Sequence, residues 1–154
     1  MVGEYRLAGM RGGIGAAILR VVPMRCLIVD DNAHFLATLR TILSGGELDV
    51  VGEATSMKEA IARATELGPD VVLLDIDLGE ESGFVVAREL VESTGELAPS
   101  IVFISAHPES DFADLIADSP ALGFVAKSEI STAAIIEVLG AGGDGVAARP
   151  EPSS

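Results

Sequence analysis

The chain has 154 residues, about the length of one domain, and 49% of them are hydrophobic, which is enough to bury a core. Its single cysteine excludes a scaffold held together by disulfide bonds. Ten basic residues against 24 acidic ones give a net charge of −14, which argues against direct binding to nucleic acid because that binding depends on lysine and arginine. No apolar stretch reaches the roughly 20 residues of a membrane span and the start of the chain does not resemble a signal peptide, so we expect a cytoplasmic protein that does not bind membranes.

The two ends of the chain differ from its middle. Residues 1–24 are rich in glycine and are predicted to be a disordered leader or the product of an over-called start site, since Met24 directly precedes the first strand. Within them, Gly9–Gly15 resembles a dinucleotide-binding loop but lacks a strand before it and a full helix after it. Residues 140–154 are rich in glycine, proline and alanine and are predicted to be a disordered tail. One domain is therefore expected over residues 25–139.

Five short apolar runs recur along the expected domain. Such runs are typical of strands that are buried on both faces, as in a parallel sheet covered by helices. The runs are Cys26–Val29, Val50–Val51, Val71–Leu74, Ile101–Ile104 and Phe124–Ala126. Segments with helical spacing separate them, so the sequence predicts five consecutive β-α units.

Helix signals fill the gaps between these runs. The first helix is expected to bury one face, made of Phe35, Leu39, Ile42 and Leu43. The second begins at a capping box of Ser56 and Glu59. The remaining helices, each with a serine at the N-cap position, are Ser82–Ser93, Ser110–Asp118 and Ser128–Leu139. The fold class expected is α/β, with a parallel sheet wound on both sides.

Polar residues gather at the carboxyl ends of the predicted strands, where ligands bind in sheets of this kind. These residues are Asp30, Asp31, Asp75, Asp77, Ser105 and Lys127. Each alone could be a polar cap at the end of a strand. Together, the carboxylates would repel one another, and a cation with oxygen ligands such as Mg²⁺ would relieve the repulsion. A lysine and a hydroxyl facing the same point suit a tetrahedral anion.

Four segments, in this order, resemble the motifs of bacterial response-regulator receiver domains. They are Cys26–Asn32, Val71–Leu78, Phe103–Ala106 and Phe124–Ser128. The resemblance covers residues 25 to about 139 and suggests a single-domain member similar to the chemotaxis regulators. It implies a flavodoxin-like (βα)5 fold with strand order 2-1-3-4-5 and a role as phosphoacceptor in a two-component phosphorelay.

The resemblance also implies a role for each residue at the strand ends. Asp75 would be the phosphoacceptor, Lys127 would pair with the phosphoryl group, and Ser105 would be the switch hydroxyl that bonds to it. Phe124 would be the aromatic switch residue. The Mg²⁺ ligands would be Asp31 directly, Asp30 largely through water, Asp75, and the backbone carbonyl of Asp77.

Two features of the loops around Asp75 bear on the comparison with the family, and only the first is a departure from its pattern. The family often has proline four residues after the phosphoacceptor, where this chain has Gly79. The positions that influence the lifetime of the phosphoryl group in the family are occupied by Asp77 and His107. The first departure loosens the loop without changing the reacting groups.

The resemblance implies that the chain is a phosphoacceptor rather than an enzyme. A histidine kinase or phosphotransfer protein would donate the phosphoryl group, and an unknown protein would receive the signal. A homodimer is possible through the helix Ser110–Asp118, the strand Phe124–Ala126 and the helix Ser128–Leu139. One alternative is the receiver half of a transcriptional regulator without its DNA-binding domain. Another is a haloacid-dehalogenase-type phosphatase, with Asp75 as nucleophile and Asp77 as acid/base.

Overall fold

A computed structural model describes residues 22–148 of the chain, and the surroundings of side chains up to residue 141. The first 21 residues, including the glycine-rich segment Gly9–Gly15, lie outside the described residues, as do residues 149–154. The first strand begins at Met24, one residue before the expected start of the domain. No helix among the described residues is both long enough and apolar enough to cross a membrane.

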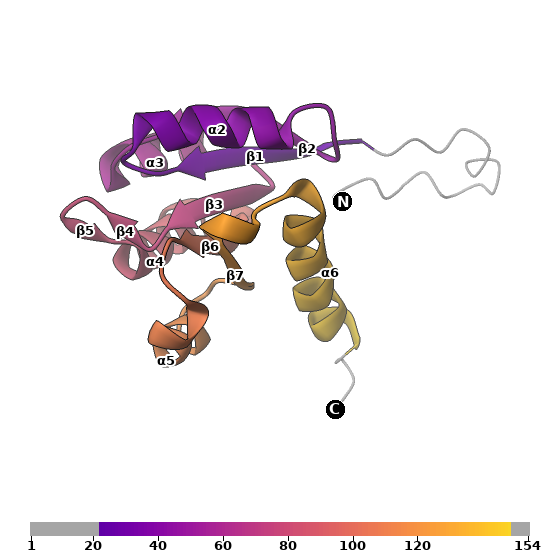
Figure 1. Cartoon of the computed structure of the whole chain (residues 1–154). Coiled ribbons are helices and arrows are strands. Elements are labelled where there is room, and N and C mark those ends of the chain that lie inside the picture. Colours follow the sequence, from indigo (N-terminus) through magenta and orange to yellow (C-terminus); the bar gives the residue numbers. More distant parts are fainter. Residues whose placement is uncertain (1–21, 149–154) are drawn as a thin grey trace, which may run out of the picture.

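Five parallel strands form one sheet in the order β2-β1-β3-β6-β7, which is the predicted 2-1-3-4-5 order when only these strands are counted (Figure 1). The strands are β1 (Met24–Val29), β2 (Leu48–Ala54), β3 (Val71–Asp75), β6 (Ser100–Ser105) and β7 (Gly123–Ala126). Each contains one of the predicted apolar runs. Every residue of β3 is buried, because the strand lies in the middle of the sheet and is covered on both faces. The flavodoxin-like fold class is thus confirmed.

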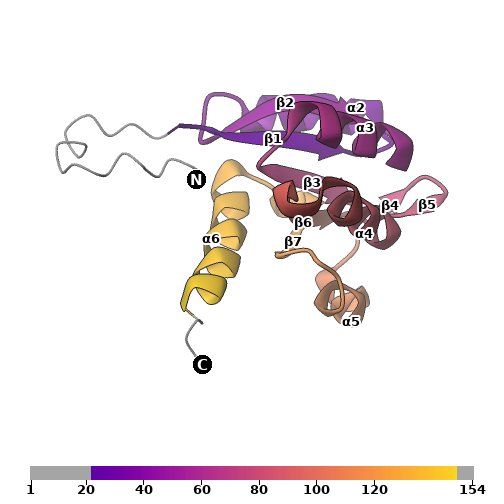
Figure 2. The same ribbon diagram turned by 180° about the vertical axis from the view of Figure 1, so that it is seen from behind.

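Helices cover both faces of the sheet. They are α2 (Ala33–Leu43), α3 (Met57–Leu67), α4 (Gly83–Thr94), α5 (Ala113–Ala117) and α6 (Thr132–Ala148). Helices α2 and α6 pack on one face, where they share a buried apolar cluster with the sheet. Helices α3, α4 and α5 pack on the other face, against a second cluster (Figures 1 and 2). This double winding leaves the carboxyl ends of the strands open as an edge.

The face that α2 presents to the sheet differs from the predicted one. The buried residues are Leu36, Leu39 and Leu43, while Phe35 is only half-buried and Ile42 is 38% exposed. The helix begins after Asn32, whose side chain accepts a hydrogen bond from the Phe35 amide and caps the first turn. The helix is therefore turned so that Phe35 lies at the side of the apolar face.

The capping box of α3 is confirmed in part. Ser56 Oγ accepts a hydrogen bond from the Glu59 amide at 3.2 Å, as the box requires. Glu59 reaches back one residue further than expected, because its carboxylate accepts from the amide of Thr55 at 2.8 Å. The helix ends at Gly68, whose backbone is left-handed with φ 57°.

The last two helices begin later than predicted. A short 3₁₀ turn, Glu109–Asp111, precedes α5, so Ser110 is not its N-cap. Similarly, Ser128 lies in a 3₁₀ turn, and Ser131 caps α6 by accepting a hydrogen bond from the Ala134 amide at 3.0 Å. Helix α6 then continues to Ala148, so residues 140–148, expected in the disordered tail, are helical. Once its packed first turns have formed, each further residue adds one hydrogen bond.

A small hairpin that the sequence analysis did not predict follows β3. Strands β4 (Asp77–Leu78) and β5 (Glu81–Ser82) are antiparallel, and their turn contains Gly79 at φ 64°. Proline, common at this position in the family, cannot adopt a positive φ. Glycine is thus the residue that this turn requires, and the loop is ordered as a hairpin.

Candidate functional site

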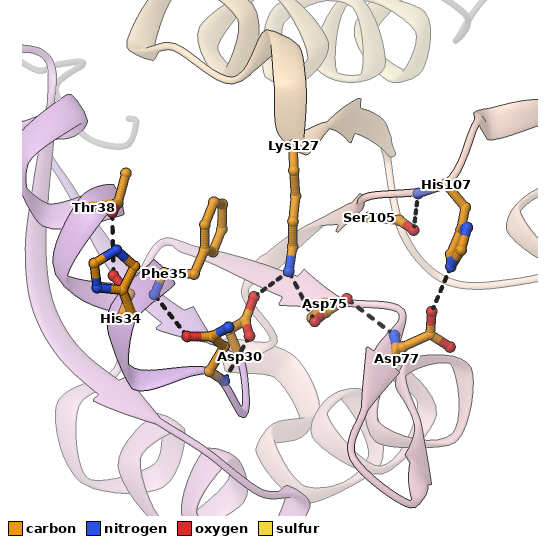
Figure 3. A network of polar contacts seen from close by, with 10 residues as sticks. Asp30, His34, Phe35, Thr38, Asp75, Asp77, Ser105, His107 and Lys127 are labelled. Carbon is orange, nitrogen blue, oxygen red and sulfur yellow. Dashed lines mark hydrogen bonds and ion pairs between the residues drawn. The ribbon is translucent and has the colours of Figure 1, made fainter.

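Four strands bring the predicted site residues to one edge of the sheet. Asp30 follows β1, Asp75 is the last residue of β3, Ser105 is the last residue of β6, and Lys127 follows β7. Because the strands are parallel and in register, their carboxyl ends lie together, and Figure 3 shows Asp30, Asp75 and Lys127 meeting at one point with Ser105 to one side. The structure therefore brings together the residues that the sequence placed at the strand ends.

Three carboxylates form a compact acidic cluster. Oxygen atoms of Asp30, Asp31 and Asp75 all lie within 4.8 Å of one another. Asp30 is fully buried and Asp75 is 5% exposed, whereas Asp31 is exposed to solvent. Asp30 Oδ1 accepts a hydrogen bond from the Asn32 amide at 2.8 Å, so the turn into α2 holds this carboxylate in place. The cluster combines two buried anions with one that is open to solvent.

Lys127 supplies the positive charge at this cluster. Its Nζ lies 2.6 Å from Asp30 Oδ2 and 3.2 Å from Asp75 Oδ2. The contact with Asp75 is a hydrogen bond, while the shorter contact with Asp30 lacks hydrogen-bond geometry and leaves Asp30 Oδ2 buried without a hydrogen-bond donor. The same ammonium lies 4.3 Å from the centre of the Phe35 ring. Lys127 is thus held between two acids and an aromatic face (Figure 3).

The surroundings change the protonation of both partners. Burial, and then the charge of Asp30, raises the pKa of Asp75 to about 6, although the Asp77 amide and Lys127 oppose the shift. Burial by itself lowers the pKa of Lys127, but the close contacts with the carboxylates of Asp30 and Asp75 and their negative charges outweigh it and raise the pKa above its ordinary value. At neutral pH the site therefore holds an ionised Asp75 beside a charged lysine.

The loops next to Asp75 are tied to the site by their backbones. Asp75 Oδ1 accepts a hydrogen bond from the Asp77 amide at 3.0 Å, and Ser105 Oγ accepts one from the His107 amide at 2.9 Å. Ser105 is fully buried, whereas Asp77 and His107 are exposed, and His107 Nε2 lies 3.9 Å from Asp77 Oδ2. The two residues at the family's lifetime-influencing positions thus face each other outside the acidic cluster (Figure 3).

Phe124 lies away from the acidic cluster, in the middle of the edge strand β7. It pairs with Phe103 of β6 and is half-buried against the apolar cluster under α4. A groove of about 420 Å³ runs beside it, with Glu129 and Glu137 among its lining residues. The predicted aromatic switch residue is therefore placed between the sheet edge and an open surface.

The donor set at the cluster fits Mg²⁺. All three side chains offer carboxylate oxygens, the ligands that this hard cation prefers. Asp30 Oδ2 is buried, and the ammonium of Lys127 that lies next to it is shared with Asp75, so a second cation would offset negative charge that one lysine leaves uncompensated. The open side of the cluster, at Asp31, leaves room for the water that Mg²⁺ usually retains.

Sequence reasoning missed three residues that shape the site. Asn32 caps α2 and holds Asp30, Phe35 contacts Lys127, and Glu81 Oε1 accepts a hydrogen bond from the Met57 amide at 2.7 Å, which ties the hairpin to α3. Asn32 could have been found, because asparagine before an apolar helical pattern is a typical N-cap. The contacts of Phe35 and Glu81 join distant segments and left no local signal.

Comparison with known proteins identifies the family of this domain. The family model described as the response regulator receiver domain matches residues 26–139. The chain belongs to the response-regulator receiver family. Members of this family accept phosphoryl groups, and the family match supports the predicted two-component context of the domain.

Individual relatives agree with this assignment. The chain is 35% identical over 144 residues to protein-glutamate methylesterase/protein-glutamine glutaminase 5 of Myxococcus xanthus, covering 86% of this chain and 41% of that protein. It is 29% identical over 106 residues to the DNA-binding transcriptional activator EvgA of Escherichia coli, covering 69% of this chain and 51% of EvgA. The chain thus spans about half, or less, of the length of these curated relatives.

Solved structures support the same fold. The receiver domain of the putative response regulator NarL from Mycobacterium tuberculosis superimposes with a TM-score of 0.68 at 31% identity. The match covers 79% of this chain and 98% of that domain. The similarity therefore includes nearly the whole NarL receiver.

Proposed function

We propose that Asp75 accepts a phosphoryl group from a phosphohistidine on a histidine kinase or phosphotransfer protein. The observation that carries this proposal is the placement of Asp75, 5% exposed at the carboxyl end of the central strand, with Lys127 3.2 Å away and two further carboxylates beside it. A carboxylate held among a cation and metal-type ligands suits nucleophilic attack on phosphorus.

The transfer exchanges one bond for another. A carboxylate oxygen of Asp75 forms a bond to phosphorus while the phosphorus–nitrogen bond to the donor imidazole breaks, and the electron pair of the broken bond stays on that nitrogen. Lys127 offsets the negative charge of the phosphoryl oxygens, because its ammonium already lies within reach of Asp75 Oδ2. The hydrogen bond from the Asp77 amide holds Oδ1 and orients the carboxylate.

Mg²⁺ belongs to this proposal. Asp31 would hold it directly, Asp30 largely through water, and Asp75 and the backbone carbonyl of Asp77 would complete the protein ligands. When bound, the ion supplies positive charge for the phosphoryl oxygens and offsets the repulsion among the carboxylates. The closeness of the three carboxylates and the buried Asp30 oxygen without a donor support this assignment.

Phosphorylation would be read out through Ser105 and Phe124. Ser105 Oγ accepts a hydrogen bond from the His107 amide and donates to no residue in the described part of the chain, so its hydroxyl hydrogen is free for a phosphoryl oxygen. Movement of Ser105 toward Asp75 would leave space next to β7, and the Phe124 side chain would move into that space. The surface formed by α5, β7 and α6 would then bind a target protein or a second copy of the chain.

We infer that the chain signals by protein contact as a single domain. The second candidate is the receiver half of a transcriptional regulator. The similarity to EvgA supports this second candidate, because the match covers 51% of that transcriptional activator. The cytoplasmic location predicted from the sequence is part of both candidates.

Phosphodonor uptake tests the proposed function against the phosphatase alternative. With Mg²⁺ and acetyl phosphate, each chain should gain at most one phosphoryl group, and hydroxylamine should remove it, as expected for an acyl phosphate. With p-nitrophenyl phosphate, the protein should release no nitrophenol beyond the background of a heat-denatured sample. Sustained turnover of that ester would contradict the proposal and support an enzyme.

A further inference from the structure

An aromatic ring lies against the ammonium of the site lysine, next to the carboxylates. Phe35 belongs to the first turn of α2, and the centre of its ring lies 4.3 Å from Lys127 Nζ. A cation within about 6 Å of a ring centre is attracted by the negative charge density of the ring face. Figure 3 shows the ring beside the end of the lysine side chain, with Asp30 and Asp75 below the ammonium.

The loop that carries the acids also holds the backbone from which the ring projects. Asn32 accepts a hydrogen bond from the Phe35 amide at 3.1 Å, and the Asn32 amide donates to Asp30 Oδ1 at 2.8 Å. One residue thus connects the position of the ring to the position of the buried acid. Because Lys127 comes from the end of β7, the contact between Phe35 and Lys127 joins the two sides of the site.

Packing alone gives a competing explanation for Phe35. The ring is half-buried and also packs against the apolar cluster under α2 and α6. An aliphatic side chain of similar size would serve that cluster about equally well. An aliphatic side chain would not attract the Lys127 ammonium. Packing alone and attraction of the ammonium therefore predict different results for Phe35→Leu.

We propose that Phe35 is a positioning residue that holds the Lys127 ammonium at the phosphoryl site through its ring face; this rests on the proposed function. Phosphorylation makes one Asp75 oxygen part of the acyl phosphate, which weakens its attraction for the ammonium. The attraction of the ring does not depend on the charge of Asp75, so it acts before and after transfer.

The test is a double-mutant cycle on the rate of phosphorylation by acetyl phosphate in Mg²⁺. Phe35→Leu should slow uptake about fivefold, which corresponds to a loss of about 1 kcal/mol. Phe35→Tyr keeps the ring face and should stay within about twofold of the wild type. In a Lys127→Met background, Phe35→Leu should cause no further loss, because the ring then has no cation to hold.

A spectroscopic signature supplements the rates and does not depend on activity in the Lys127→Met background. In the wild type and in Phe35→Tyr, the ring should shift the NMR signals of the Lys127 ε-methylene protons upfield. Phe35→Leu should return them to ordinary lysine values while its melting temperature stays near that of the wild type.

Two results would overturn the inference: Lys127 signals that do not respond to Phe35→Leu, or a loss of rate that is the same with and without Lys127. Failure of the wild type to take up phosphate would instead overturn the proposed function.

Discussion

The Lys127 ammonium lies closer to Asp30 than to Asp75, at 2.6 Å against 3.2 Å. Asp30 is fully buried, and its Oδ2 has no hydrogen-bond donor among the described residues. Lys127 is therefore the main compensation for a buried negative charge that is not itself the proposed phosphoacceptor. The stability of the resting protein and the chemistry of the site depend on the same lysine.

Removing Lys127 should therefore destabilise the protein. Lys127→Met leaves Asp30 buried without a counter-charge, and the free energy of unfolding in EDTA should fall by roughly 3 kcal/mol. The double variant Asp30→Asn/Lys127→Met should recover a large part of that loss, because the charge that needed compensation is gone. Urea titrations of the three proteins measure this. A double variant no more stable than Lys127→Met would show that Lys127 stabilises the fold through other contacts.

The raised pKa of Asp75 predicts a pH dependence of stability in the absence of metal. Its folded-state pKa is about 6, above the roughly 3.9 of an unfolded chain, so between these values the folded protein binds more protons. Asp75 therefore stabilises the fold fully below about pH 4, and this contribution is lost as the pH rises through 6. In EDTA, the stability of the wild type relative to Asp75→Asn should fall over that interval. A difference that is constant from pH 4 to 7 would contradict the assigned environment.

Mg²⁺ should stabilise the wild type and act less on Asp31→Asn. At about 100 times Kd, binding to the folded form adds about 2.7 kcal/mol, or a rise in melting temperature of roughly 5–10 °C. Asp31→Asn should gain far less from Mg²⁺, yet melt slightly higher than the wild type in EDTA, because one repelling charge is removed from the cluster.

The matched control for this prediction is Asp49→Asn. Asp49 is an exposed acid near the start of β2, at the opposite end of the strands from the cluster, and its variant should keep the full Mg²⁺ response. If Asp31→Asn also keeps the full response and melts lower in EDTA, Asp31 is a structural cap and the metal binds elsewhere.

Gly83 should tolerate no side chain. A Cβ at this position would lie 2.5 Å from the carbonyl oxygen of Asp75 and 2.7 Å from Cα of Ile76, and backbone atoms cannot move aside cheaply. Gly83→Ala should lower stability by about 1–3 kcal/mol and slow phosphorylation, since Asp75 is displaced. Gly140→Ala, in open space on helix α6, should instead raise stability by up to about 1 kcal/mol. Melting curves in which both variants behave alike would contradict the close approach at Gly83.

Much of the fold could be predicted because each strand is a short apolar run between helical segments. Val71–Leu74, for example, is buried on both faces of β3, and such a run leaves a clear signal. The hairpin of Asp77–Leu78 and Glu81–Ser82 left none, since strands of two residues show no periodicity. The cap of α6 was placed at Ser128 instead of Ser131, because either serine fits the local pattern.

The part of the candidate site that lies at the ends of the strands could be predicted from the sequence. Parallel strands bring their carboxyl ends together, so the meeting of Asp30, Asp75 and Lys127 follows from topology. The contact between Phe35 and Lys127 does not, because it depends on the rotation of α2 about its axis. A helix rotated by one residue turns by about 100°, and sequence spacing does not determine which of two adjacent apolar residues faces the sheet.

The position of the phosphoryl group tests the central claim most directly. The protein would be incubated with Mg²⁺ and acetyl phosphate and reduced with borohydride, which converts an aspartyl phosphate to homoserine, and then sequenced by tandem mass spectrometry. We expect one modified residue, at position 75, and no uptake by Asp75→Asn. A modification at another residue, or undiminished uptake by Asp75→Asn, would show that Asp75 is not the phosphoacceptor.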